Sequence, residues 1–206
     1  MTNLAWLRAE VAATAREMAE RGLVSGTAGN VSRRDPDTGW VAITPTGRPY
    51  ATLTAELVSL LDPAGQIQAG EPPSREYPLH ASLYRARPDI GAVVHTHSPA
   101  ISALAILGSE LPPVLIEMAY AVGGAVPCAP FQPPGSQQLG EEAVRTLGDG
   151  RAVILANHGL VVVGEAGPVA LELARLVEET AAAYLWARAV GQPRILTSVE
   201  IRTDNP

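Results

Sequence analysis

The sequence predicts an α/β fold in a single domain. Short apolar runs rich in β-branched residues are typical of buried strands, and longer segments between them carry apolar residues at helical spacing. No internal repeat, low-complexity tract or linker divides these segments, so we expect residues 1–206 to form one domain. A hydrophobic content of 47%, with 17% charged residues, is enough for a sizeable core.

Helices are predicted where helical apolar spacing is followed by a stop signal. The expected helices cover residues 4–19, 74–87, 99–107, 138–147 and 168–190. Gly22 and Gly108 are the expected C-terminal stops of the first and third helices. Ser74 is the expected N-cap of the second helix, because its hydroxyl group can accept from a free backbone N–H.

Strands are predicted in the apolar runs between these helices. They are expected over residues 40–44, 66–68, 91–97, 152–156 and 161–164. Residues 54–61 mix helical and strand signals, and residues 111–118 are expected to be extended. The result is a chain in which helices and strands share one core.

Charge and cysteine content exclude several classes of protein. The net charge of −6 argues against a nucleic-acid partner, which usually meets a basic surface. Residues 1–20 lack the apolar stretch of a signal peptide, and no apolar run reaches membrane-spanning length. The single cysteine, Cys128, excludes an internal disulfide and fits a reducing compartment. We therefore expect a cytoplasmic protein without a membrane or nucleic-acid partner.

The run VVHTHS, residues 93–98, carries the strongest chemical signal. Side chains alternate along a strand, so His95 and His97 point to one face and Thr96 to the other. Two neutral imidazoles placed this way can bind one metal ion. The alternative is that two core or surface histidines alternate without binding anything.

Two further segments offer ligands for the same ion. His158 follows the apolar strand 152–156 and precedes Gly159, so it is either a ligand or a turn histidine with a local hydrogen bond. Glu76 begins a helix, where a carboxylate also serves as a simple cap. We interpret His80, on the same helix face as Glu76, as structural. Three imidazoles and a carboxylate in a chain with one cysteine favour a catalytic zinc site over a structural one.

Anion-binding features accompany these ligands. The glycine-rich segment 25–32 offers unobstructed backbone N–H groups, although an ordinary tight turn would look the same. The turn 45–50 places a hydroxyl group, a glycine N–H and a guanidinium together, and the helix start near Ser74 offers free N–H groups. These segments predict a phosphorylated substrate.

Six motifs give the chain a family resemblance. They are GTAGNVS at 26–32, ITPTG at 43–47, PSRE at 73–76, AVVHTH at 92–97, VPCAP at 126–130 and NHGL at 157–160. In this order they resemble the class II aldolase/adducin family over nearly the whole chain, and they are most similar to its L-fuculose-phosphate aldolase branch.

The resemblance implies a three-layer α/β/α fold with a largely antiparallel central sheet. It also implies a homotetramer with active sites at the subunit contacts. Zn²⁺ would be bound by His95, His97 and His158, with Glu76 as a fourth ligand in the resting site. Sites with this ligand set also accept Co²⁺ or Mn²⁺. The residues implied to bind the substrate phosphate are Thr27, Gly29, Asn30, Thr46, Gly47 and Ser74, and we add Arg75 as a further anion-binding residue.

The activity implied is that of a metal-dependent aldehyde-lyase. It would cleave a ketose 1-phosphate such as L-fuculose 1-phosphate to dihydroxyacetone phosphate and an aldehyde, through a zinc-stabilised enediolate. Glu76, displaced from the metal by substrate, would move the proton as general acid/base. Similar scaffolds carry pentulose-phosphate 4-epimerases, methylthioribulose-phosphate dehydratases and 3-oxo-tetronate-phosphate decarboxylases. The epimerases usually have Asp at the position of Glu76, which favours a lyase. A non-catalytic adducin-like domain would not need all four ligands.

Three departures from the fuculose-type pattern concern the substrate. Arg75 replaces the second of two serines, and it suits either a phosphate or a carboxylate group. Glu117 replaces a tyrosine, although Tyr120 is close by, and the chain continues only shortly beyond Ile201, without the branch's tyrosine-containing tail. Both tyrosines are associated with handling the aldehyde. The departures therefore leave the aldehyde substrate open, while the metal site is expected to be kept.

Overall fold

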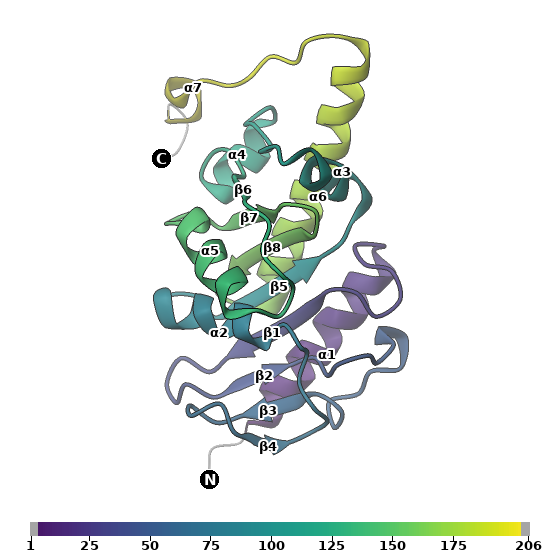
Figure 1. Cartoon of the computed structure of the whole chain (residues 1–206), viewed down its shortest axis with the longest axis vertical. Helices are drawn as coiled ribbons and strands as arrows, with labels where there is room; N and C mark the ends of the chain where they lie inside the picture. The colour runs from purple at the N-terminus through teal and green to yellow at the C-terminus, as the bar shows by residue number, and fades with distance from the viewer. Residues whose placement is uncertain (1–3, 203–206) are drawn as a thin grey trace.

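The computed structural model describes residues 4–202 and places eight strands in one sheet. The strands are β1 (Asn30–Arg34), β2 (Val41–Ile43), β3 (Ser59–Leu61), β4 (Ile67–Ala69), β5 (Ala92–Thr96), β6 (Cys128–Ala129), β7 (Ala152–Leu155) and β8 (Gly159–Gly164). Their order across the sheet is β4-β3-β2-β1-β5-β8-β7-β6 (Figure 1). Every pair is antiparallel except β6 and β7. The prediction of a largely antiparallel sheet is confirmed.

Helices cover both faces of this sheet. They are α1 (Ala5–Glu20), η1 (Tyr50–Thr52), α2 (Tyr77–Ala86), α3 (Pro99–Leu107), α4 (Ile116–Val122), α5 (Gln137–Leu147), α6 (Gly167–Val190) and α7 (Ser198–Arg202). Helices α1, α3 and α6 pack on one face, while α2 and α5 pack on the other. The predicted three-layer α/β/α arrangement is therefore confirmed.

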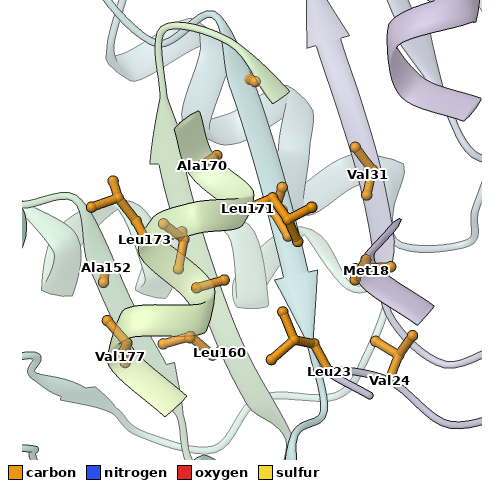
Figure 2. Close-up of a cluster of buried hydrophobic side chains, with 14 of the residues drawn as sticks. Met18, Leu23, Val24, Val31, Ala152, Leu160, Ala170, Leu171, Leu173 and Val177 are labelled. Carbon is orange, nitrogen blue, oxygen red and sulfur yellow. The ribbon is translucent and has the colours of Figure 1, made fainter. Parts of the chain in front are cut away.

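The larger core lies between the sheet and the α1–α3–α6 layer. Figure 2 shows Leu171 and Val177 of α6 lying over the sheet, with Val177 near Leu160 of β8. Leu171 is 1% exposed, and Val177 and Leu160 are fully buried. Burying an aliphatic side chain of this kind contributes about 1.5–3 kcal/mol. Because β5 and β8 are covered on both faces, their strand ends have fixed positions.

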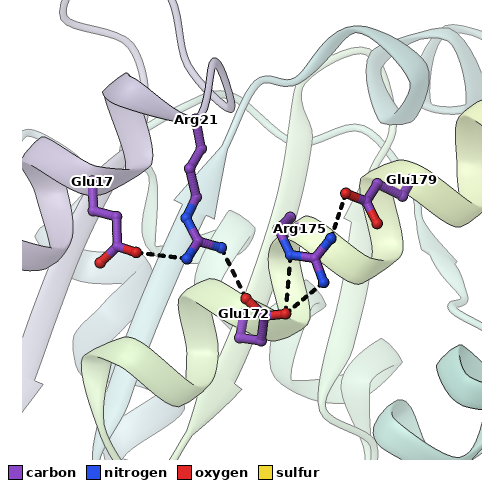
Figure 3. A network of polar contacts seen from close by, with 5 residues as sticks. All are labelled: Glu17, Arg21, Glu172, Arg175 and Glu179. Atoms are coloured by element: carbon purple, nitrogen blue, oxygen red, sulfur yellow. Dashed lines mark hydrogen bonds and ion pairs between the residues drawn. The ribbon is translucent and has the colours of Figure 1, made fainter.

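A surface network joins α1 to α6 at the edge of this layer. Arg21 contacts Glu17 at 2.6 Å and Glu172 at 2.8 Å, and Arg175 contacts Glu172 at 2.5 Å and also Glu179 (Figure 3). Water and salt screen these exposed charges, so the network contributes little to stability.

Three local predictions are corrected by the structure. Residues 116–122 form α4 although 111–118 was expected to be extended, because Met118, Ala119 and Val122 are buried at helical spacing. Within 54–61 only Ser59–Leu61 is regular, as strand β3. Ser74 is not the N-cap of α2, which begins at Tyr77.

The start of α2 follows from the proline at its second position. A proline in the first turn needs no backbone hydrogen bond, so Pro78 fits there and the helix begins one residue earlier. Ser74 instead accepts a hydrogen bond from the Glu76 N–H at 3.2 Å, which orders the approach to the helix. Among residues 4–202, no helix combines the length and the apolar character needed to cross a membrane.

Candidate metal centre and substrate pocket

The predicted ligands converge from three separate segments. His95 lies in β5, His97 follows that strand directly, and His158 lies in the turn between β7 and β8. The ring centroids of these histidines are 4.7–5.0 Å apart. Glu76 directly precedes α2 and lines the same hollow as the glycine-rich loop. The side chains of all four residues therefore meet at one point.

Backbone geometry explains how His158 reaches this point. Asn157 has a φ of 55°, which lets the chain reverse tightly after β7. A Cβ atom at Gly159 would lie 2.3 Å from the Thr96 carbonyl oxygen and 3.0 Å from the His97 ring. Only glycine fits here. Because it has no side chain, the β7–β8 turn can lie directly against the end of β5.

The donor atoms are arranged as a metal would require. One ligand atom from each residue lies within 4.8 Å of all the others. The Nε2 atoms of His95 and His97 are 2.8 Å apart, and the Glu76 carboxylate oxygens lie 3.2 Å from Nε2 of His95 and 3.2 Å from Nε2 of His158. Nδ1 of His95 donates to the Leu160 carbonyl oxygen at 2.8 Å, which leaves its Nε2 lone pair facing the group. Three imidazoles and a carboxylate fit Zn²⁺, Co²⁺ or Mn²⁺.

The charge state of these groups suits metal binding. Burial alone would raise the pKa of Glu76, but the close contacts with the His158 and His95 imidazoles outweigh burial and hold that pKa well below its usual range. Burial, followed by the neighbouring imidazoles, lowers the pKa of His97 to about 4. Glu76 is therefore a carboxylate and His97 a neutral imidazole at neutral pH, which are the forms that bind metal ions.

A hollow of about 450 Å³ opens beside the four-residue group. All seven residues predicted to bind phosphate line it together with Glu76, His97 and His158: Thr27, Gly29, Asn30, Thr46, Gly47, Ser74 and Arg75. Arg75 is exposed at its rim and has no hydrogen-bond or ion-pair partner within residues 4–202. The hollow is thus lined by neutral polar groups, the unpaired Arg75 guanidinium and the Glu76 carboxylate.

Gly29 and Asn30 have a structural role that the sequence did not reveal. A Cβ atom at Gly29, where φ is +72°, would lie 2.5 Å from the His95 carbonyl oxygen. Asn30 pairs with His95 across the β1–β5 ladder, and its amide nitrogen donates to Glu76 Oε2 at 2.8 Å. The glycine-rich loop therefore contacts the cluster of Glu76 and the three histidines, here called the metal group, and also lines the hollow.

Several supporting residues were not predicted as part of the site. Glu178 of α6 accepts hydrogen bonds from Ser98 Oγ at 2.7 Å and from the N–H groups of Ala100 and Ile101 at 2.8 and 2.9 Å. It thereby caps α3 directly after His97, and nothing in its sequence surroundings indicates this long-range contact. His80 lies outside the four-residue group, as predicted, but it contacts Asn30 at 2.5 Å.

Glu117, which replaces a tyrosine of the fuculose-type pattern, and the nearby Tyr120 lie elsewhere. Glu117 and Tyr120 are in α4 and do not line the hollow beside Glu76. Tyr120 lines a different hollow, next to Pro113, Leu196 and Ile201. Within the described part of one chain, Tyr120 therefore does not reach the metal group.

Comparison with known proteins agrees with this geometry. Residues 9–185 match the family model for the class II aldolase and adducin N-terminal domain. The chain belongs to the class II aldolase and adducin family. This confirms the family and fold class that the sequence motifs predicted.

Relatives within the class II aldolase and adducin family are similar over nearly their whole length. A 5-deoxy-D-ribulose 1-phosphate aldolase of Bacillus thuringiensis serovar kurstaki is 40% identical over 94% of this chain and 91% of its own. An L-fuculose phosphate aldolase of Escherichia coli is 38% identical over 95% of this chain and 90% of its own. The solved structure of an L-fuculose 1-phosphate aldolase has a TM-score of 0.91 at 30% identity and covers 95% of this chain and 92% of that one. These relatives confirm the prediction of a class II aldehyde-lyase.

Proposed function

We propose that this protein is a metal-dependent aldolase that cleaves a ketose 1-phosphate into dihydroxyacetone phosphate and an aldehyde. The position of Glu76 carries the proposal. Its carboxylate lies 3.2 Å from two of the three clustered histidines, and it lines the same hollow as the polar loops. One side chain therefore connects a metal group with a pocket suited to a phosphate.

The three histidines and Glu76 would bind one divalent ion, for which we propose Zn²⁺. When bound, this ion supplies a Lewis acid that stabilises the negative charge left by carbon–carbon cleavage. The neutral His97 and the Nδ1 hydrogen bond of His95 keep the imidazole lone pairs available for it.

Glu76 is the proposed general acid/base. Cleavage of the C3–C4 bond requires one proton to leave the C4 hydroxyl group and one proton to be added at C3. The Glu76 carboxylate faces the hollow where these atoms would lie, so it can accept a proton and then donate one. The Asn30 amide orients this carboxylate, and the hydrogen bond from the Glu76 backbone N–H to Ser74 Oγ fixes the backbone that carries it.

The phosphate group would occupy the outer part of the hollow. Thr27, Thr46 and Ser74 offer hydroxyl groups there, while Gly47, where a Cβ atom would meet nothing within 4 Å, lets the substrate approach the backbone closely. Arg75 adds the positive charge that a phosphate dianion favours. This local charge offsets the chain's overall net charge of −6.

The identity of the sugar is the finer part of the proposal. Relatives of similar identity are named for 5-deoxy-D-ribulose 1-phosphate and for L-fuculose phosphate, so both sugars are candidates. Glu117 and Tyr120 lie away from the hollow, which favours an aldehyde product that needs no tyrosine contact within the chain. A short, apolar aldehyde from a 5-deoxypentulose 1-phosphate fits this condition.

The test is release of dihydroxyacetone phosphate, measured with a coupled dehydrogenase. Zinc-loaded protein would be offered 5-deoxy-D-ribulose 1-phosphate, L-fuculose 1-phosphate, L-rhamnulose 1-phosphate and D-ribulose 1-phosphate. We expect release that stops with chelator, with the 5-deoxypentulose turned over fastest. No release from any of the four would contradict the proposal. In that case a phosphorylated 3-oxo acid would be tested next, because the unpaired Arg75 also suits a carboxylate group.

A further inference from the structure

A row of buried, hydrogen-bonded polar side chains runs from Glu76, just before α2, to Tyr84 near the C-terminal end of that helix. Asn30 Nδ2 is 2.8 Å from Glu76 Oε2, and Asn30 Oδ1 is 2.5 Å from His80 Nε2. His80 Nδ1 is 2.6 Å from Ser32 Oγ, which is 2.7 Å from the Tyr84 hydroxyl group. The four residues beyond Glu76 are at most 5% exposed. Each polar group in the row must therefore be satisfied inside the protein.

Simple chemistry fixes the direction of every hydrogen bond in this row. A carboxylate only accepts, so Asn30 must turn its amide nitrogen to Glu76 and its oxygen to His80. That oxygen requires a donor, which places the proton of His80 on Nε2. A neutral imidazole has one N–H, so Nδ1 accepts from the Ser32 hydroxyl group, and Ser32 in turn accepts from Tyr84.

Two further observations support this single arrangement. Burial lowers the pKa of His80 to about 3, so the ring stays neutral at physiological pH and keeps one accepting nitrogen. Tyr84 is itself fixed, because the Arg34 guanidinium lies 4.9 Å from its ring centroid and donates to its carbonyl oxygen at 2.8 Å. Tyr84, the residue of the hydrogen-bonded row furthest from Glu76, is therefore held in place.

This row of hydrogen bonds orients its side chains and does not conduct protons. A side-chain amide has no readily exchanged proton path between its oxygen and its nitrogen, so Asn30 interrupts any relay from His80 to Glu76. Instead, each hydrogen bond in the row fixes the orientation of the next side chain. If Asn30 flipped, its oxygen would face the Glu76 carboxylate, and two acceptors would be opposed in a buried site.

We propose that His80 is a positioning residue for Glu76: its Nε2–H holds the Asn30 amide so that the amide nitrogen stays on the carboxylate. The proposal rests on the proposed function, in which Glu76 moves the proton. It gives His80 a role in turnover although His80 touches neither the hollow nor the four-residue metal group. It also gives Asn30 a second role, because its amide nitrogen is engaged with Glu76 as well as lying at the phosphate hollow.

Three substitutions at one position test this role. In His80→Gln, the side-chain amide nitrogen can take the place of Nε2 and still donate to Asn30. His80→Asn has the same chemical group, but it reaches only the position of Nδ1, and His80→Leu has no donor. For His80→Leu and His80→Asn we expect kcat to fall about 10-fold to 100-fold, as is typical when a group behind an active-site residue is lost.

Measuring kcat and KM separately distinguishes a positioning role of His80 from a general disturbance of the fold. KM should change much less than kcat, because Asn30 alone among the seven proposed phosphate-binding residues is hydrogen-bonded to His80, and metal content should stay at one ion per chain. His80→Gln should recover most of kcat. If His80→Leu fails to fold, the Gln and Asn variants still decide, since they differ only in reach.

Two results would overturn the proposal. One is a folded, metal-loaded His80→Leu or His80→Asn variant with wild-type kcat. The other is a Gln variant as slow as the Asn variant, which would show that the imidazole serves packing alone. Glu76→Gln is measured alongside: if it turned over normally, the proposed role of Glu76 itself would be wrong, whatever the His80 variants show.

Discussion

Glu76 combines two demands that rarely fall on one side chain. It is held as a carboxylate by His158 and His95, and its second contact, from the Asn30 amide, fixes its orientation. A carboxylate so placed can bind a metal at rest and exchange a proton when substrate displaces it. At the scale of single residues, this double role and the charge of Arg75 determine the expected chemistry.

The first residue-scale prediction concerns Glu76→Gln. The amide keeps the size of the side chain but cannot act as an acid/base at neutral pH, so kcat should fall by about 100-fold or more. The three histidines remain, and metal content should therefore stay near one ion per chain. Metal analysis and steady-state kinetics on the same preparation check both parts. Unchanged kcat would remove Glu76 from the mechanism.

Arg75 provides the second residue-scale prediction. Arg75→Ala removes the unpaired guanidinium at the rim of the hollow, so KM for the sugar phosphate should rise about tenfold, in line with a charge-assisted hydrogen bond of about 1.5 kcal/mol. Arg145→Ala is the matched control, because Arg145 is an exposed arginine that pairs with Glu142 on α5, away from the hollow. Equal KM values for the two variants would contradict the assignment of Arg75.

At the scale of elements, the site depends on how closely loops pass strand ends. The loop before β1 lies against the carbonyl group of His95, and the β7–β8 turn lies against Thr96. Gly29 and Gly159 permit these two close contacts, which bring side chains from separate strands together. The metal group is thus built by strand pairing and by the tight turns that follow it.

Gly29→Ala tests this close approach. The added Cβ atom would lie 2.5 Å from the His95 carbonyl oxygen at a φ of +72°, so we expect the free energy of unfolding to drop by about 2–4 kcal/mol. Gly26→Ala is the control: φ is +64° there, but nothing lies within 4 Å, so only about 1 kcal/mol should be lost. Denaturant unfolding of both variants measures the difference. Equal losses would show that the contact with His95 is unimportant.

At the scale of the whole molecule, apolar side chains are exposed near the C-terminal end of α6 and beyond it. Trp186 is 74% exposed, Val190 is 90% exposed and Ile195 is 54% exposed. Such exposure is typical of surfaces that are covered by another copy of the chain. It supports the prediction of a homotetramer, which remains to be measured, as does the predicted cytoplasmic location.

Light scattering after size-exclusion chromatography measures the assembly directly. We expect a mass four times that of the 21.5 kDa chain. Trp186→Glu should lower the assembly state, because a carboxylate would be buried in an apolar contact. Glu179→Gln on the same helix is the control and should leave the mass unchanged. A monomeric wild-type protein would contradict the tetramer prediction.

The histidines that come together with Glu76 could be selected from the sequence because each one follows a local pattern. His95 and His97 are two residues apart in one predicted strand, and His158 follows an apolar run that predicts another. The alternation of side chains along a strand and the positions of the strand ends were therefore sufficient to select these histidines. The contacts of His80 and Glu178 could not be predicted in this way. They depend on the packing of α2 against β1 and of α6 against α3, which join residues 50 and 80 positions apart. Helix α4 was missed because its apolar spacing is short and follows two prolines.

The central claim is that one metal ion, bound by the histidine cluster, is required for cleavage. The most direct test is a titration of metal-free protein with Zn²⁺ while dihydroxyacetone phosphate release is followed. Activity should rise in proportion to added metal and level off at one ion per chain, and His95→Ala should show no rise. Full activity of the metal-free protein, or a titration that His95→Ala follows as the wild type does, would contradict the account.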